Sequence, residues 1–118
     1  DKLSSRPQRG RFRQQAEFVV WGSNGSMPED RGVGCLPGVF RAANVQGSER
    51  IHQTQKPLDV MRQVVQICVP GGRILDPFAG SGTTLAAAAE EGFDAVGIEA
   101  HMTIAKAAAQ RLGIELST

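Results

Sequence analysis

The chain has 118 residues, enough for one domain with a modest core, and its net charge of +1 excludes a strongly acidic or strongly basic protein. No stretch approaches the roughly 18 apolar residues that a membrane span needs. Two cysteines without a C-x-x-C spacing predict no metal site and a reduced, cytoplasmic protein.

The charge is unevenly distributed along the chain. Residues 1–56 carry nine basic against five acidic side chains, whereas residues 57–118 carry four against seven. Most of the excess lies near the start, where the basic residues are Lys2, Arg6, Arg9, Arg11 and Arg13. Such a basic front is compatible with a phosphate backbone as partner, but charge alone favours a solvated, partly disordered arm.

The first half of the chain shows little periodicity. Residues 1–15 are polar and predicted to be irregular, and Glu17–Gly22 has the β-branched and aromatic content of a strand. Residues 26–55 are rich in Gly, Pro, Arg and Asn, with a possible short strand at 38–41. A loop this long is typically functional or disordered.

The second half alternates between helical and strand patterns. Pro57 is suited to a helix start, and the apolar spacing after it predicts a helix to Val69. The remaining elements are predicted as a strand at 73–76, a helix at 83–91, a strand at 94–99, a helix at 101–112 and a third strand at 114–116. This order predicts an α/β fold with parallel strands and helical crossovers.

The most specific motif joins the first of these strands to its helix. It reads Asp-Pro-Phe-Ala-Gly-Ser-Gly-Thr-Thr from Asp76 to Thr84. A strand that ends in a carboxylate and turns through glycines into a helix presents backbone N–H groups to an anionic group. Glu99 ends the next strand, where a carboxylate commonly binds ribose hydroxyls. The two features predict a cofactor that contains a nucleoside.

Three kinds of glycine-rich cofactor loop could account for this motif. A Walker loop needs Gly-Lys-Ser/Thr, but Thr83 follows Gly82. A dinucleotide loop needs a small third residue where this chain has Leu85. S-adenosyl-L-methionine fits better, because its ammonium suits Asp76, its carboxylate suits the N–H groups of the turn, and its ribose suits Glu99.

The run from Asp76 to Thr84 resembles the cofactor loop of the amino-group DNA methyltransferases, which methylate adenine N6 or cytosine N4. The stretch His52–Leu58, which contains Lys56-Pro57, is similar to the segment before this loop in the permuted, β-type members. The segments Arg6–Phe12 and Glu17–Gly25 resemble those of phage and prophage members. The family also serves DNA methylation in restriction–modification.

The resemblance implies a partial Rossmann-like methyltransferase fold with S-adenosyl-L-methionine as cofactor and double-stranded DNA as partner. The residues implied to bind the cofactor are Lys56, Pro57, Asp76, Pro77, Phe78, Gly80, Ser81, Gly82, Thr83, Thr84 and Glu99. Those implied to contact DNA are Arg9, Arg11, Arg41 and Arg50. From the residues alone, Pro57, Thr83 and Thr84 are equally compatible with a purely structural role at helix starts, and Phe78 with the core.

No catalytic residue is predicted. The family holds the target amine with an Asp/Asn/Ser-Pro-Pro-Tyr-type tetrapeptide, and this sequence has neither a Pro-Pro pair nor a tyrosine. We therefore expect the C-terminal part of such an enzyme, with residues 1–55 as a DNA-facing arm and residues 56–118 as a cofactor-binding half-domain. It should be inactive alone and should pair with a copy of itself or with the missing half. The alternatives are a non-catalytic DNA-binding module and a subunit of a split enzyme.

Overall fold

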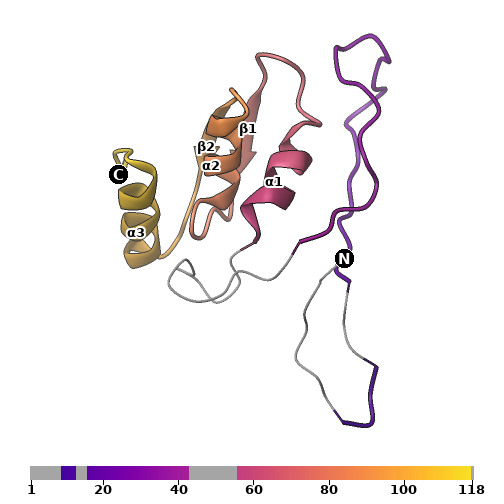
Figure 1. The fold of residues 1–118 in the computed structure, drawn as a ribbon. Helices are drawn as coiled ribbons and strands as arrows, with labels where there is room; N and C mark the ends of the chain where they lie inside the picture. Colours follow the sequence, from indigo (N-terminus) through magenta and orange to yellow (C-terminus); the bar gives the residue numbers. More distant parts are fainter. Residues whose placement is uncertain (1–8, 13–15, 43–55, 118) are drawn as a thin grey trace.

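The computed structural model describes residues 9–12, 16–42 and 56–117. Its elements, in chain order, are α1 (Leu58–Val65), β1 (Arg73–Asp76), α2 (Thr83–Glu90), β2 (Asp94–Gly97) and α3 (Met102–Leu112). Helices α1 and α2 pack against each other beside the strands, while α3 lies at the far side of the sheet from the N-terminal segment (Figure 1). Over these residues, every helix is too short or too polar to cross a bilayer.

The strands form a two-stranded parallel sheet. Arg73 lies opposite Asp94, and Asp76 lies opposite Gly97. Helix α2 connects the two strands, so the predicted α/β unit with a helical crossover, a partial Rossmann-like fold, is confirmed. β2 ends at Gly97 rather than at the predicted Glu99, because its partner β1 already ends at Asp76.

The two faces of the sheet differ in exposure. Ile74 and Ala95 are half-buried, whereas Leu75 and Val96 on the opposite face are 61% and 46% exposed. This alternation follows from the two-residue period of a strand. Among the described residues, the buried apolar ones are Val65, Ala87, Ala88, Ala108 and Ala109, all from helices. We call the surface formed by Leu75 and Val96 the outer sheet face.

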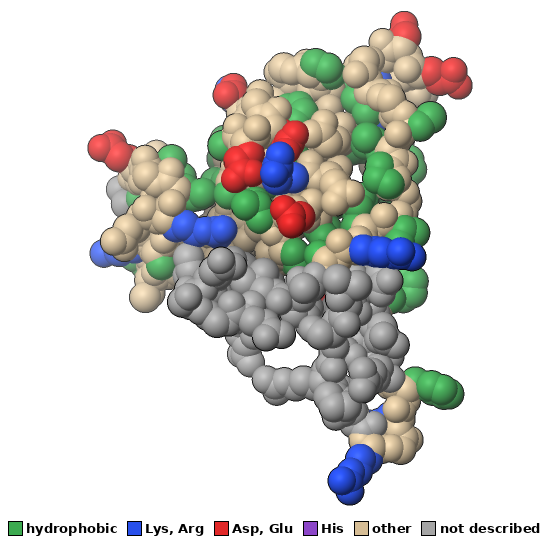
Figure 2. Space-filling model, viewed as in Figure 1, with side chains coloured by type: hydrophobic (Ala, Val, Ile, Leu, Met, Phe, Trp, Pro, Cys, Tyr) green, Lys and Arg blue, Asp and Glu red, His purple; other side chains and the backbone are tan. Residues whose placement is uncertain are grey.

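An ionic cluster joins α1 to the end of α2. Nε of Arg62 lies 2.7 Å from Oε1 of Glu91 and 3.3 Å from Oε2 of Glu90, and Nε2 of Gln66 donates to the Glu91 carboxylate. The hydrogen bond and the charge of Glu91 raise the pKa of Arg62 above its ordinary value. Acidic and basic side chains gather at the centre of this face (Figure 2), beside a cavity of about 290 Å³. The cluster therefore fixes the helix before β1 to the helix after it.

The first helix is shorter than predicted. α1 ends at Val65, and the chain tightens through bonds from the Ile67 N–H to the Val64 carbonyl (3.3 Å) and from the Cys68 N–H to the Val65 carbonyl (3.0 Å). Pro70 disfavours helical geometry at the residue before it, which explains why the helix does not reach Val69.

Three predicted strands are wrong. Residues 17–22, 38–41 and 114–116 have the composition of strands but are irregular in the structure. Strand composition becomes a strand only beside a partner, and the sheet of the described residues contains β1 and β2 alone. Trp21 accordingly lies 71% exposed.

The N-terminal segment is attached beside α1. Nζ of Lys56 lies 2.7 Å from Oε2 of Glu17, and Nη1 of Arg31 donates to the Ile67 carbonyl at 2.9 Å. These contacts place the front of the chain next to α1 and far from α3 (Figure 1).

Candidate functional site

The turn between β1 and α2 depends on glycine backbone geometry. Gly80 and Gly82 have φ angles of +53° and +76°, a region that side-chain-bearing residues rarely adopt. Gly82 also occupies the N-cap position of α2. A Cβ at Gly82 would lie 2.8 Å from Cδ1 of Leu112, so a substitution there would also crowd α3.

Backbone hydrogen bonds hold this turn against the end of β2. The Ile98 N–H donates to the Asp76 carbonyl, and the Ala79 N–H donates to the Ile98 carbonyl, both at 2.8 Å. The close fit continues at Gly97, where an added Cβ would lie 2.9 Å from Cβ of Ala79. The carboxyl ends of the two strands therefore meet at one edge, which places Asp76 and Glu99 together.

Glu99 connects the turn to the start of α3. Its Oε2 accepts the Gly80 N–H at 3.0 Å, and its Oε1 accepts the His101 N–H at 2.9 Å. His101 is the N-cap residue of α3 but makes no side-chain cap. The Glu99 carboxylate instead satisfies an N–H at the helix start, where negative charge is favoured by the helix dipole.

Asp76 shapes the first part of the turn. Its Oδ1 accepts the Phe78 N–H at 3.0 Å, an Asx turn that directs the backbone away from the strand. Phe78 itself is 88% exposed, so its alternative placement in the core is wrong. Pro77 is exposed between them.

The first residues of α2 are buried where the turn enters the helix. Ser81 and Thr83 are each 5% exposed, and their hydroxyl oxygens lie 3.2 Å apart. Thr84 is half-buried in the first turn of α2. These hydroxyls bond within the turn, which restricts its conformation.

A cavity of about 280 Å³ lies between the turn, the end of β2 and α3. Of the predicted residues it brings together Gly80, Gly82 and Glu99, and it adds Met102 and Ala105 from α3. Its volume is close to the lower end of the roughly 300–1,000 Å³ that ligand pockets typically enclose. Sequence reasoning missed Met102. The sequence feature that could have identified it is the apolar face predicted for the helix at 101–112.

The predicted residues that do not line this cavity are Asp76, Pro77, Phe78, Ser81, Thr83 and Thr84, which flank it in the turn, and Lys56 and Pro57. Pro57 is the N-cap residue of α1 and its carbonyl accepts the Met61 N–H, which agrees with its alternative interpretation as a helix start. Lys56 is paired with Glu17 instead of lining the cavity.

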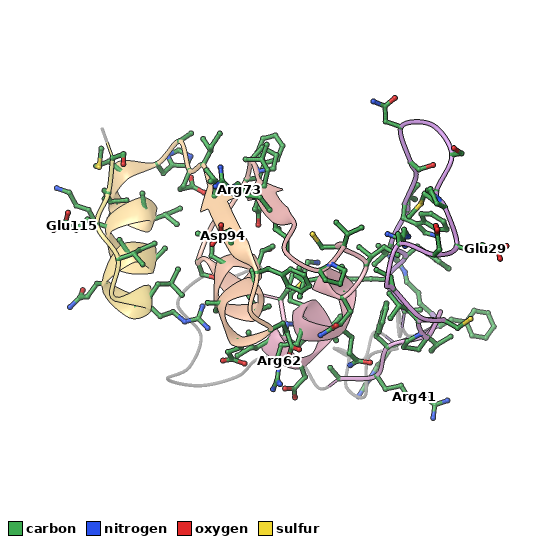
Figure 3. All side chains as sticks on the ribbon, turned by 90° about the horizontal axis from the view of Figure 1, so that it is seen from above. Glu29, Arg41, Arg62, Arg73, Asp94 and Glu115 are labelled. Carbon is green, nitrogen blue, oxygen red and sulfur yellow. The ribbon has the colours of Figure 1, made fainter. Side chains whose placement is uncertain are left out.

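The candidate DNA-contacting arginines lie on the N-terminal part of the chain. Arg9, Arg11 and Arg41 are exposed, whereas Arg50 falls outside the described residues. Figure 3 shows Arg41 at the opposite end of the molecule from Glu115, which follows α3. Arg41 therefore lies on the N-terminal side of the molecule, away from α3.

Two of the known proteins that this chain resembles are type II methyltransferases. The chain is 46% identical over 65 residues to the type II methyltransferase M.HindIII of Haemophilus influenzae, covering 54% of this chain and 21% of the relative. It is 43% identical over 77 residues to the type II methyltransferase M.ScaI of Streptomyces caespitosus, covering 64% and 25%. The chain thus matches about a quarter of the length of these relatives.

A solved structure and a family model extend the match to most of the chain. The crystal structure of an M1.HpyAVI–SAM complex superposes with a TM-score of 0.66 and 26% identity, covering 96% of this chain and 59% of that one. The DNA methylase model N6_N4_Mtase matches residues 4–110. Sequence and backbone agree over nearly the same span, and the chain belongs to the N6_N4_Mtase family of DNA methylases.

Proposed function

We propose that residues 56–118 bind S-adenosyl-L-methionine and form the cofactor-binding part of a DNA amino-methyltransferase. The proposal rests on the arrangement at the carboxyl end of the sheet, where the β1–α2 turn is hydrogen-bonded to Glu99. Asp76 and Glu99 lie at the same edge, and the Gly80 N–H between them donates to Glu99 at 3.0 Å. A carboxylate at the end of β1, a glycine turn and a second carboxylate two residues beyond the end of β2 thus lie at one edge of the sheet, where the turn and Glu99 also line the cavity.

The residues of this site fit the cofactor chemically. Asp76 offers a carboxylate for the ammonium group, and the turn and the start of α2 favour an anion such as the methionine carboxylate. A carboxylate has about four lone-pair sites, so Glu99 can accept ribose hydroxyls while keeping its bonds to Gly80 and His101. The cavity beside Met102 and Ala105 adds an apolar wall. When bound, the cofactor supplies an electrophilic methyl group.

The methyl acceptor is proposed to be the exocyclic amine of adenine or cytosine in double-stranded DNA. The relatives named as type II methyltransferases support this class. The sequence has no Pro-Pro-Tyr-type tetrapeptide, so we propose that residues outside it hold the flipped base and that this chain is inactive alone. Lys56-Pro57 precedes Asp76, an order that supports the permuted type.

We further propose that residues 1–55 form the DNA-facing part of the chain. Arg9, Arg11 and Arg41 are exposed there, and Arg50 belongs to the same predicted group. Phosphate contacts of this kind position a protein on DNA without reading its sequence.

Isothermal titration calorimetry with S-adenosylhomocysteine tests the cofactor proposal. We expect saturable binding, and weaker binding of adenosine, because adenosine lacks the amino-acid tail that the turn and Asp76 would hold. Adenosine is the matched control, since it presents the same ribose and base to Glu99. No heat from S-adenosylhomocysteine at high micromolar concentration would contradict the proposal.

The outer sheet face is proposed to be covered by protein, either a second copy of the chain or the half that carries the tetrapeptide. Leu75 and Val96 expose apolar surface side by side in register. A two-stranded sheet is marginally stable without such cover.

Sedimentation velocity, together with thermal unfolding, tests whether protein covers the outer sheet face. We expect the isolated chain either to self-associate or to unfold without cooperativity. We also expect Leu75→Lys to reduce self-association. Val39→Lys is the control, because Val39 is also exposed but lies outside the sheet. A monomer that unfolds cooperatively would overturn this proposal.

A further inference from the structure

We infer that Arg111 is a positioning residue for the cofactor turn, which it holds from α3 through the Ser81 carbonyl. The inference rests on the proposed function for the role of the turn. Arg111 lies in the last turn of α3, and its Nη1 donates to the Ser81 carbonyl oxygen at 3.0 Å. The two residues are 30 positions apart, so the bond connects separate elements.

The acceptor belongs to a peptide unit that is held at both ends. The Ser81 carbonyl and the Gly82 N–H share one planar peptide group. The Gly82 N–H donates to the Ala79 carbonyl at 2.8 Å, and Arg111 binds the opposite end of the same plane. A rotation of this plane would therefore break two hydrogen bonds at once.

This peptide needs an external restraint because of the residue that follows it. Gly82 has a φ of +76°, and glycine occupies positive and negative φ with similar ease. Without the bond from Arg111, one of the two hydrogen bonds that hold the plane before Gly82 is lost, and the glycine itself does little to oppose reorientation. Reorientation would break the bond from the Gly82 N–H to the Ala79 carbonyl and change the shape of the turn that is proposed to bind the cofactor.

A second contact keeps α3 in register with the turn. A Cβ at Gly82 would lie 2.8 Å from Cδ1 of Leu112 and 3.5 Å from Cβ of Ala108. Both residues lie on α3 within one turn of Arg111, and Ser81 is only 5% exposed. The guanidinium thus reaches a carbonyl that is shielded from water, at a place where helix and turn already touch.

The test compares Arg111→Met with Arg111→Lys by calorimetry with S-adenosylhomocysteine. Met keeps the aliphatic packing but removes the donor, and we expect about tenfold weaker binding, the equivalent of one modest hydrogen bond. Lys keeps a charged donor, and we expect it to lose no more than about threefold. Lys106→Met is the matched control, because it removes a charge from an exposed position of the same helix. Equal affinities of Arg111→Met and wild type would overturn the inference.

Amide hydrogen exchange in the ligand-free protein gives an independent measurement. We expect Arg111→Met to accelerate exchange of the Gly82 N–H, while Lys106→Met leaves it unchanged; unchanged exchange in Arg111→Met would overturn the inference. If the wild-type protein binds no S-adenosylhomocysteine, only the proposed function is contradicted, because hydrogen exchange of the Gly82 N–H still measures the effect of Arg111 on the turn. Should Arg111→Met fail to fold, Arg111→Lys is compared with Arg111→Gln, and equal exchange in these two would overturn the inference.

Discussion

Replacing Asp76 with alanine is expected to abolish measurable binding of S-adenosylhomocysteine, a loss of at least about 100-fold. The change removes the carboxylate proposed to face the ligand's ammonium group. It also removes the acceptor of the Phe78 N–H, which shapes the turn. Calorimetry measures the affinity, and thermal unfolding shows whether the variant remains folded.

Asp76→Asn separates the two effects. An asparagine oxygen can accept the Phe78 N–H and preserve the Asx turn, but it carries no charge. We expect Asp76→Asn to keep the thermal stability of the wild type while binding S-adenosylhomocysteine far more weakly. Wild-type affinity in Asp76→Asn would show that the ammonium is not held by this carboxylate.

The second large effect is expected at Glu99. Glu99→Ala removes the acceptor of the Gly80 and His101 N–H groups and frees the turn from the start of α3. Hydrogen bonds to charged groups contribute about 1.5–3 kcal/mol, and these two are partly solvated, so we expect a loss of about 2 kcal/mol in unfolding free energy. Urea denaturation measures the change, and calorimetry should show weaker binding of S-adenosylhomocysteine.

Two further variants test whether the stability lost in Glu99→Ala comes from the hydrogen bonds of its carboxylate. Glu99→Gln retains one acceptor oxygen but turns an NH₂ group toward an N–H donor, so its stability should lie between alanine and wild type. Glu115→Ala removes an exposed carboxylate beyond α3 and should change stability by less than about 0.5 kcal/mol. If Glu99→Ala resembles Glu115→Ala, the carboxylate does not join the turn to α3.

The elements that could be predicted from sequence are those whose signals are local. Pro57, Pro70 and Gly113 mark helix boundaries, and α2 and α3 were located to within about a residue of their observed ends. The wrong predictions concern which segments pair with another strand. Whether residues 17–22 or 114–116 form a strand depends on a neighbour, and composition does not specify a neighbour.

The same distinction applies to the site. The motif from Asp76 to Thr84 and the position of Glu99 were recognisable because the motif begins at the end of β1 and Glu99 follows β2 by two residues, and parallel strands bring such ends together. The contribution of Arg111 was not recognisable, because its acceptor is a backbone carbonyl 30 residues away. A helical pattern indicates which side chains share a face, but it does not indicate what that face touches.

The cluster that joins α1 to α2 has a consequence for folding. Arg62 and Glu91 are 29 residues apart, Gln66 and Glu91 are 25 apart, and Gly80 and Glu99 are 19 apart. The entropic cost of closing such loops grows only with the logarithm of their length, so the cost differs little among these three contacts. All partners of this cluster lie between Arg62 and Glu91, so it can form without any residue of the N-terminal segment.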